Sequence, residues 1–367
     1  MRVALVDPAA YTLPYDHQLA AALARRGHEV DLVTSPFLHG TPPRAEGYRR
    51  HEVFFPLSGR ILRGRPRSPL RFAVKGLEYL PSVWRLVRKL DELGPDVVHI
   101  QWLPLPRLDR RWLPRLARSR PVVFTAHDVL PRRSEADVGH WRELFLAADR
   151  TVVHSERARE RLLEIGIPPE RIAVIPHPLF LPGNGSEPRP PNGRTLLFFG
   201  LIRPNKGLDV LLRALPVVAS LVPDVRLVVA GDALVPVETR SATKRVDWRL
   251  RYISEAEIPG LMDEATVVVL PYRKIESSGV LATALGYGRP VVVTDVGSLG
   301  DTVREFRAGE VVPPEDPDAL GAACARLLTD ETALAQAFAG TRKAAHALTW
   351  DAAAAAHEAL YEGVLRA

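Results

Sequence analysis

The chain has 367 residues, of which 46% are hydrophobic and 25% are charged, as expected for a globular protein with more than one domain. Its one cysteine, Cys324, excludes an internal disulfide bond, and no His/Cys cluster has zinc-site spacing. No apolar run approaches the ~20 residues that span a bilayer, and residues 2–6 read as a buried strand rather than a secretory signal. We therefore expect a cytoplasmic protein.

The net charge of +6 is unevenly distributed along the sequence. Residues 44–89 hold twelve Lys and Arg against three Glu, and Trp84, Leu86 and Leu90 interleave with the basic residues in a helical pattern. Two interpretations are open: weak peripheral contact with an anionic membrane, or a solvated helix face beside an arginine-rich loop. No recognition motif accompanies the charge, so nucleic acid is not an expected partner.

In the first half of the chain, short apolar runs alternate with helical patterns. The helical stretches 18–26 and 156–165 end at Gly27 and Gly166, and glycine in this position is a helix stop signal. Buried strands alternating with helices predict a doubly wound parallel sheet. The expected strands are residues 2–6, 30–34, 97–100, 122–125 and 151–154, with a weaker one at 173–175.

The composition then changes, because residues 176–193 hold too much Pro and Gly for regular structure and read as a linker. A second doubly wound domain follows, and residues 350–365 form an Ala-rich helix. The domains that we expect are residues 1–180, a linker at 181–194, residues 195–345, and a C-terminal helical segment at 346–367. The expected strands of the second domain are residues 196–199, 225–230, 267–270, 290–294 and 309–312.

The most informative motif lies at the start of the second domain. An apolar run stops at Gly200 and a helical pattern begins at Leu208, with Arg203 and Lys206 in the turn between them and Gly207 closing it. Free backbone N–H groups and the helix dipole favour anions beside a helix start, and Arg and Lys bind phosphate oxygens. The turn therefore indicates a diphosphate site, and a solvated turn with two cations is the alternative.

A second candidate motif follows the expected strand at 267–270. Ser277 and Ser278 are helix-capping residue types before a small-residue helix at 279–285, whose first N–H groups can bind an anion or a hydroxyl. Glu276 precedes this helix, where its carboxylate can accept hydrogen bonds from sugar hydroxyls. Favourable electrostatics at a helix start is the other explanation for a glutamate there.

The third candidate is His127, which follows the expected strand at 122–125. A histidine at the carboxyl end of a parallel strand can bind a sugar hydroxyl or a phosphate, or transfer a proton. His99 occupies the analogous position on the preceding strand, whereas His154 and His177 are interpreted as structural. A structural role remains the alternative for His127 as well.

Two nucleotide-binding classes are disfavoured by what the sequence lacks. The first strand is followed by Asp7-Pro-Ala-Ala-Tyr rather than a Gly-x-Gly-x-x-Gly turn, and no Walker-type phosphate loop occurs. A dinucleotide or ATP is therefore not expected.

Together these segments resemble the retaining glycosyltransferases of family 4, which have the GT-B fold of two Rossmann-like domains facing a central cleft. The resemblance covers nearly the whole chain, and its most specific motif is Gly200-Leu-Ile-Arg-Pro-Asn-Lys206-Gly. It implies transfer of a sugar from a nucleoside-diphosphate-sugar donor to an unidentified hydroxyl acceptor, with no metal and no cofactor. It also implies that the final helix crosses back to the N-terminal domain.

The resemblance implies a role for each candidate residue. His127 and Glu276 would be the catalytic residues in contact with the sugar. The acceptor would dock near the loop after the first strand, where two tyrosines suggest a stacking pocket. The residues implied for the donor diphosphate are Gly200, Arg203, Lys206, Ser278, Gly279 and Val280; those for the nucleoside are Thr283, Tyr252 and Ile253; and those for the acceptor are Tyr11, Tyr15 and Asp16.

The sequence departs from the family pattern at the second glutamate of the family's paired motif, which usually holds the ribose. Thr283 or Ala284 stands there, according to which glycine is aligned. This leaves two alternatives to an active transferase. One is a non-catalytic nucleotide-sugar-binding partner subunit, and the other is a retaining phosphorylase of the same fold.

Overall fold

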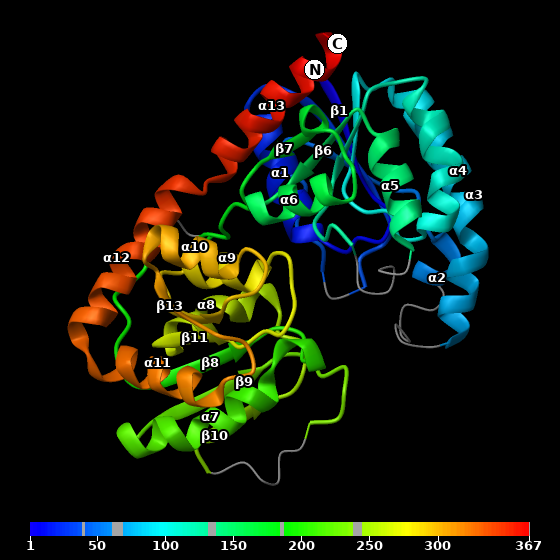
Figure 1. Cartoon of the computed structure of the whole chain (residues 1–367). Coiled ribbons are helices and arrows are strands. Elements are labelled where there is room, and N and C mark those ends of the chain that lie inside the picture. Colours follow the sequence, from blue (N-terminus) through cyan, green and yellow to red (C-terminus); the bar gives the residue numbers. More distant parts are fainter. Residues whose placement is uncertain (39–40, 61–68, 131–136, 184–186, 238–243, 367) are drawn as a thin grey trace. The chain divides into compact units, whose positions relative to one another are not determined.

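The structure is a computed structural model that describes residues 1–38, 41–60, 69–130, 137–183, 187–237 and 244–366 (Figure 1). The chain divides into two compact units: Met1–Pro176 with Trp350–Ala367, and His177–Thr349. Part of the basic segment 44–89 and part of the expected linker at 181–194 lie outside the described residues. Each unit is built on a parallel sheet with helices around it, so the predicted α/β fold class is confirmed.

The sheet of the first unit has the strand order β3-β2-β1-β4-β5-β6-β7, and neighbouring strands are parallel. Its strands are β1 (Arg2–Asp7), β2 (Glu29–Thr34), β3 (Arg49–Glu52), β4 (Val97–Ile100), β5 (Val122–Thr125), β6 (Arg150–Val153) and β7 (Ile172–Val174). Its helices are α1 (Leu13–Arg25), α2 (Pro56–Arg60), α3 (Pro69–Leu93), α4 (Pro106–Ala117), α5 (Val138–Ala147), α6 (Glu156–Glu164) and α13 (Trp350–Arg366).

The second unit repeats this plan with the order β10-β9-β8-β11-β12-β13. Its strands are β8 (Thr195–Phe199), β9 (Arg226–Ala230), β10 (Val246–Arg249), β11 (Val267–Leu270), β12 (Val291–Thr294) and β13 (Gly309–Val312). Its helices are α7 (Leu208–Leu221), α8 (Ile258–Glu264), α9 (Gly279–Gly286), α10 (Leu299–Phe306), α11 (Pro317–Thr329) and α12 (Glu331–Ala347).

Each sheet has a point where the strand order reverses. The first unit reverses between β1 and β4, and the second between β8 and β11. In open α/β sheets, ligands bind at the carboxyl ends of the strands beside such a point. The Arg203/Lys206 turn follows β8, and the Glu276 segment follows β11, so both second-unit motifs lie at this position.

Two strands were not predicted from the sequence, and both are sheet edges. β3 has the sequence Arg-Arg-His-Glu, and β10 has Val-Asp-Trp-Arg. An edge strand pairs on one side and stays half-buried, so it needs no continuous apolar run. The interior strands are largely apolar and buried, and their predicted positions are confirmed to within one or two residues.

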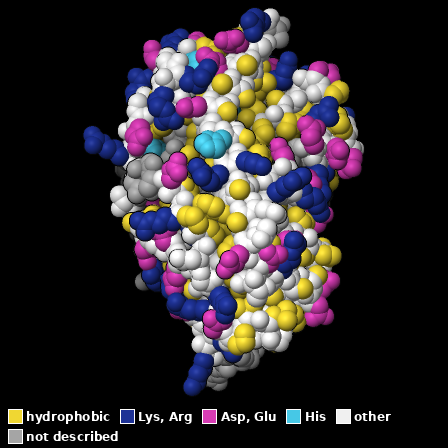
Figure 2. Space-filling view, turned by 90° about the vertical axis from the view of Figure 1, so that its left-hand side faces the viewer, with side chains coloured by type: hydrophobic (Ala, Val, Ile, Leu, Met, Phe, Trp, Pro, Cys, Tyr) yellow, Lys and Arg dark blue, Asp and Glu magenta, His cyan; other side chains and the backbone are white. Residues whose placement is uncertain are grey.

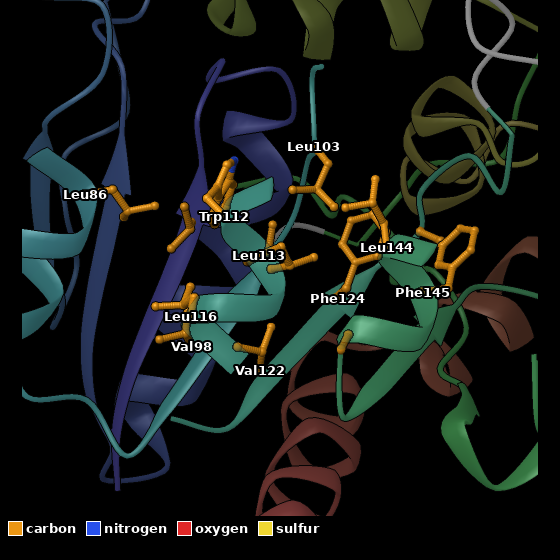
Figure 3. Close-up of a cluster of buried hydrophobic side chains, with 14 of the residues drawn as sticks. Leu86, Val98, Leu103, Trp112, Leu113, Leu116, Val122, Phe124, Leu144 and Phe145 are labelled. Atoms are coloured by element: carbon orange, nitrogen blue, oxygen red, sulfur yellow. The ribbon is translucent and has the colours of Figure 1, made fainter. Parts of the chain in front are cut away.

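The core of the first unit lies between its sheet and the helices α3, α4 and α5 (Figure 3). Side chains from the strands pack against side chains from these helices and are almost fully buried, which supplies the main favourable term in folding. The labelled members of this cluster are Leu86, Val98, Leu103, Trp112, Leu113, Leu116, Val122, Phe124, Leu144 and Phe145.

Helix α13 belongs to the first unit, although it follows the second unit in the sequence (Figure 1). Its Tyr361 hydroxyl lies 2.7 Å from Nδ1 of His99 in β4, and Glu358 accepts a 2.7 Å hydrogen bond from Nε of Arg26. Within the described residues, no helix is both long and apolar enough to cross a membrane.

Candidate functional site

The turn from β8 to α7 is shaped by Gly207. This residue has a left-handed φ of 67°, and a Cβ there would lie 1.9 Å from the carbonyl oxygen of Pro271. Glycine alone tolerates both the conformation and the approach. Gly207 therefore brings the short helix Pro204–Lys206 against the segment that follows β11.

The two cations of this turn differ in their surroundings. Arg203 is half-buried, and its buried Nε has no hydrogen-bond acceptor among the residues that the structure describes. The ammonium of Lys206 lies 3.6 Å from the centre of the Tyr272 ring, a cation–π contact. A guanidinium whose buried donor finds no acceptor in the described part of the chain is suited to an anionic ligand.

The first turn of α9 lies directly beside the β8 end. A Cβ on Gly200 would lie 3.0 Å from Cγ2 of Val280. The Ser278 hydroxyl caps the helix by accepting a 3.3 Å hydrogen bond from Leu281 N, so the N–H groups of Gly279 and Val280 have no acceptor within the helix. The structure thus brings Gly200 against the first turn of α9, which contains Gly279 and Val280.

Arg273, which the sequence analysis did not single out, braces this arrangement. Its guanidinium forms ion pairs with Asp209 (2.6 Å) and Glu315, and these two carboxylates raise its pKa. The same guanidinium donates to the carbonyl oxygen of Pro204 at 2.5 Å. Since two carboxylates neutralise its charge, Arg273 holds the Arg203/Lys206 turn in place rather than adding a third phosphate-binding cation.

Glu276 lies just before α9, and Thr283 lies within it. The half-buried Glu276 segment is fastened through its backbone, since the Glu276 carbonyl accepts hydrogen bonds from N and Oγ of Ser298, both at 2.9 Å. The Thr283 hydroxyl donates to the Gly279 carbonyl at 2.8 Å, so its hydrogen is already used within the helix. A ribose hydroxyl can meet only the acceptor lone pairs of Thr283.

A cavity of about 240 Å³ opens at the carboxyl end of β10. Of the predicted nucleoside residues, Ile253 lines it, whereas Tyr252 is 43% exposed on the adjoining surface. The full lining consists of Arg249, Arg251, Ile253, Ala256, Glu257, Gly260 and Leu261.

In the first unit, His127 lies just beyond the end of β5 and is only 7% exposed. The Trp102 ring stacks on its imidazole with ring centres 5.1 Å apart, and the Tyr15 ring lies perpendicular to it with centres 4.9 Å apart. Its Nε2 lies 3.1 Å from Gln101 Oε1, and its Nδ1 lies 3.2 Å from His154 Nε2. The ring plane of His127 is therefore held on several sides.

The predicted acceptor residues fall into two groups. Tyr11 is 61% exposed, and its ring contacts Trp102 with centres 5.0 Å apart. Tyr15 is 2% exposed and Asp16 is fully buried, because both lie on the inner face of α1. The exposed Tyr11 therefore forms an aromatic surface with the half-buried Trp102, through an edge-on contact, and Trp102 was not anticipated from the sequence.

Asp16 faces Asp7, the last residue of β1. Burial raises the pKa of both carboxyl groups, and the charge of Asp7 helps to raise that of Asp16 well above its usual range. Asp7 accepts hydrogen bonds from the backbone N–H groups of Ala9 (3.0 Å) and Thr12 (3.2 Å), which favours its charged form. Asp7 is thus the carboxylate of the pair, and Asp16 carries the proton.

His99 has a structural position. It is fully buried, with Nδ1 2.7 Å from the Tyr361 hydroxyl and Nε2 2.7 Å from Thr125 Oγ1. Burial lowers its pKa well below the usual value. In the part of the chain that the structure describes, no group of three or more His, Cys, Asp or Glu is placed to hold a metal ion.

Two family models match the chain. Glycosyltransferase Family 4 matches residues 15–179, and Glycosyl transferases group 1 matches residues 193–330. Among curated proteins, the phosphatidyl-myo-inositol mannosyltransferase of Mycolicibacterium smegmatis is 28% identical over 99% of this chain and 94% of its own length. The D-inositol 3-phosphate glycosyltransferase of Thermobispora bispora is 28% identical over 96% of this chain and 89% of its own length.

Solved structures share the fold. Sucrose-phosphate synthase from Thermosynechococcus elongatus superimposes with a TM-score of 0.74 at 20% identity, covering 100% of this chain and 99% of that one. Anabaena Alr3699/HepE, solved in complex with UDP-glucose, has a TM-score of 0.70 at 18% identity, covering 99% of this chain and 100% of that one. Both likenesses extend over the two units.

Proposed function

Since the chain belongs to the family-4 glycosyltransferases of GT-B type, we propose that it transfers a sugar, with retention of configuration, from a nucleoside-diphosphate sugar to an acceptor hydroxyl. In this proposal the diphosphate needs no metal ion, because Arg203 and Lys206 supply the positive charge. The observation that carries the proposal is the half-buried Arg203, whose Nε has no acceptor in the described residues, in the turn after β8, the strand whose end contacts the first turn of α9 through Gly200 and Val280.

The donor would bind along the carboxyl edge of the second sheet. Its diphosphate would meet Arg203 and Lys206 in the turn after β8, and the N–H groups of Gly279 and Val280 in the helix start that contacts Gly200. The 240 Å³ cavity beside Ile253 is then a candidate for part of the nucleoside. Glu276 would accept hydrogen bonds from the sugar hydroxyls. A UDP-glucose complex of a protein with the same fold supports this class of donor.

The chemistry that we propose is electrostatic. The bond between the sugar carbon and the diphosphate oxygen breaks, and the acceptor oxygen bonds to the same carbon from the same face. The acceptor proton passes to a phosphate oxygen of the departing diphosphate. Arg203 and Lys206 would stabilise the charge that builds on the leaving group, an effect worth several kcal/mol when donors are pre-positioned.

For the acceptor, we propose a phosphate-bearing polyol that binds to the first unit. The names of two relatives specify an inositol that carries phosphate. In this chain, Arg71 and Lys75 lie one turn apart on α3, and Lys75 interacts electrostatically with Asp7 at the end of β1. Burial, followed by the charge of Arg71, lowers the pKa of Lys75 to about 8. Two cations partly withdrawn from water would favour an anion.

We also propose that α3 touches an anionic membrane. Leu77 is 81% exposed, Leu80 52% and Trp84 60%, and their spacing puts them on one face of this helix. The excess of positive charge at residues 44–89 would complement anionic lipid. By contrast, Lys and Arg side chains are mixed with Asp and Glu over the face drawn in Figure 2.

The test removes both cations of the turn. Arg203→Ala combined with Lys206→Ala should lower transfer at least about 100-fold and abolish the thermal stabilisation by UDP, GDP or ADP. The matched control, Arg342→Ala with Lys343→Ala, removes the same charge from an exposed face of α12 in the same unit and should leave both unchanged. Activity of the turn variant within about tenfold of the parent would refute the proposal.

The same assays separate the alternatives. Nucleotide binding without transfer or donor hydrolysis would identify a partner subunit. Stabilisation by inorganic phosphate but by none of the nucleotides would identify a phosphorylase.

A further inference from the structure

His154 is a buried histidine at the end of β6 that lies against His127. Its Nδ1 is 2.9 Å from the carbonyl oxygen of Ile175. A carbonyl oxygen can only accept a hydrogen bond, so Nδ1 of His154 carries a proton. Burial lowers the pKa of His154 to about 4, so at neutral pH the ring carries one proton. Its Nε2 is therefore an acceptor.

The direction of this hydrogen bond fixes the direction of the next one, between His154 and His127. Nδ1 of His127 lies 3.2 Å from the Nε2 of His154, and two lone pairs cannot face each other at this distance. His127 therefore donates from Nδ1. The main-chain carbonyl of Ile175 thus sets the hydrogen positions of two successive imidazoles.

The surroundings of Gln101 are consistent with Nε2 of His127 being an acceptor. The side-chain amide of Gln101 lies 3.1 Å from Nε2 of His127 and is fully buried. With the amide oxygen on that side, the amide nitrogen meets no acceptor among the described residues. The other orientation of the amide lets the nitrogen donate to His127, and it leaves an acceptor rather than a donor unmet, which costs less.

The aromatic neighbours hold the His127 ring so that its nitrogens cannot exchange places easily. Trp102 covers one face at an interplanar angle of 15°, and Tyr15 meets the ring at 89°. The Trp102 indole is itself anchored by a 2.8 Å hydrogen bond to the Thr12 hydroxyl. The ring position and the tautomer are therefore determined by different neighbours.

We propose that His154 is a positioning residue: bound to the Ile175 carbonyl, it keeps His127 in the tautomer protonated at Nδ1. Nε2 of His127 is then an acceptor that the Gln101 amide meets in the ligand-free protein, and that a sugar hydroxyl would meet in place of this amide. The role toward sugar rests on the proposed function, whereas the tautomer belongs to the protein alone. An isolated histidine side chain has no such constraint. For histidines that bind a metal ion, loss of the hydrogen-bond partner of the other ring nitrogen typically lowers affinity or activity about 10- to 100-fold, and we expect an effect of similar size here.

The experiment reads the tautomer directly. In protein labelled with ¹⁵N-histidine at pH 7.5 and without ligand, two-bond ¹H–¹⁵N spectra should show both His127 and His154 protonated at Nδ1 only. Signals are assigned by their loss in His127→Gln and His154→Phe. A proton on Nε2 of His127, alone or together with one on Nδ1, would overturn the inference.

The variants add a second readout. His154→Phe keeps a ring but no acceptor, so His127 should populate both tautomers, and kcat should fall at least tenfold with the KM for the donor unchanged. His154→Gln can donate to Ile175 and accept from His127, and should restore both properties. His357→Phe is the matched control, a fully buried histidine that also donates to a carbonyl, that of Ala353.

An unchanged His127 tautomer in His154→Phe would overturn the inference. If that variant does not fold, the parent spectrum and His154→Gln still decide. Failure of the proposed function would be distinguishable, because the spectra could still show the expected tautomers in a protein that transfers no sugar.

Discussion

The ammonium of Lys206 lies 3.6 Å from the centre of the Tyr272 ring, so an aromatic residue just beyond one strand contacts the cation that follows the neighbouring strand. Tyr272 follows β11, and Lys206 lies in the turn after β8, the two strands at the reversal of the second sheet. The contact limits the rotamers of a long side chain before any ligand arrives.

We expect Tyr272→Leu to weaken donor binding about fivefold, because a partly buried cation–π contact contributes about 1 kcal/mol. Tyr272→Phe keeps the ring and should bind the donor as the parent does. Isothermal titration with UDP or GDP gives both constants. Equal losses in the two variants would assign the effect to the hydroxyl rather than to the ring.

Gly207→Ala should lower the free energy of unfolding by more than about 2 kcal/mol. The added methyl group needs a left-handed backbone and meets the Pro271 carbonyl at 1.9 Å. Gly363→Ala, in α13, is the control, since nothing lies within 4 Å of its added Cβ. This control should be neutral or slightly stabilising in a chemical denaturation series. A Gly207→Ala variant as stable as the parent would show that the turn can move away from Pro271.

His357 should contribute to acid sensitivity. Burial lowers its pKa to about 4, whereas an unfolded histidine titrates near 6.5. Between these values the unfolded state binds a proton that the native state does not, so stability is present above pH 6.5 and is lost as the pH falls toward 4.

His357→Phe should therefore reduce the slope of unfolding free energy against pH, by up to about 1.4 kcal/mol per pH unit in that window. The replacement of exposed His346 should leave the slope as in the parent. Urea denaturation at half-unit steps from pH 4.5 to 7 measures it.

The Asp7/Asp16 pair should respond asymmetrically to amide substitution. A carboxyl whose pKa is raised on folding loses stability as the pH rises above its unfolded value near 3.9. Asp16→Asn mimics the protonated group without titrating, so it should stabilise the protein at pH 8 by about 1 kcal/mol or more relative to the parent.

Asp7→Asn should destabilise the protein at the same pH, because it replaces an oxygen that accepts a backbone N–H from Ala9 or Thr12. Unfolding free energies at pH 5 and pH 8 decide the matter. Equal effects of the two substitutions would show that the proton is not localised on Asp16.

Membrane contact by α3 predicts co-sedimentation with vesicles containing phosphatidylglycerol at low salt, and release at high salt. Leu77→Glu with Trp84→Glu should reduce the bound fraction at least fivefold. Leu365→Glu, which alters an exposed leucine on α13, should not. Failure of the parent protein to bind these vesicles at low salt would rule out the contact.

The fold could be predicted because its interior strands carry a strong local signal. In the buried strands β4, β5 and β11, polar and apolar residues do not alternate. This pattern is typical of strands in a sheet that is covered on both faces. The edge strands β3 and β10 have no such signal, since pairing rather than burial decides them. Their positions depend on neighbours far away in the sequence.

The candidate site was predictable where one segment contains its own chemistry. Arg203, Lys206 and Gly207 lie within five positions, and their turn is closed by local geometry. The contacts of Trp102 with His127, and of Asp7 with Asp16, join separate elements and leave no local pattern. Whether His127 and Glu276 act on a sugar stays a prediction.

The position of α13 has a consequence for biosynthesis. His99 in β4 meets Tyr361, so a core contact of the first unit waits for residues translated after the whole of the second. On the ribosome, the second unit can therefore complete its fold while the first unit still lacks helix α13. Nascent chains stalled before residue 350 should therefore keep the first unit sensitive to proteases.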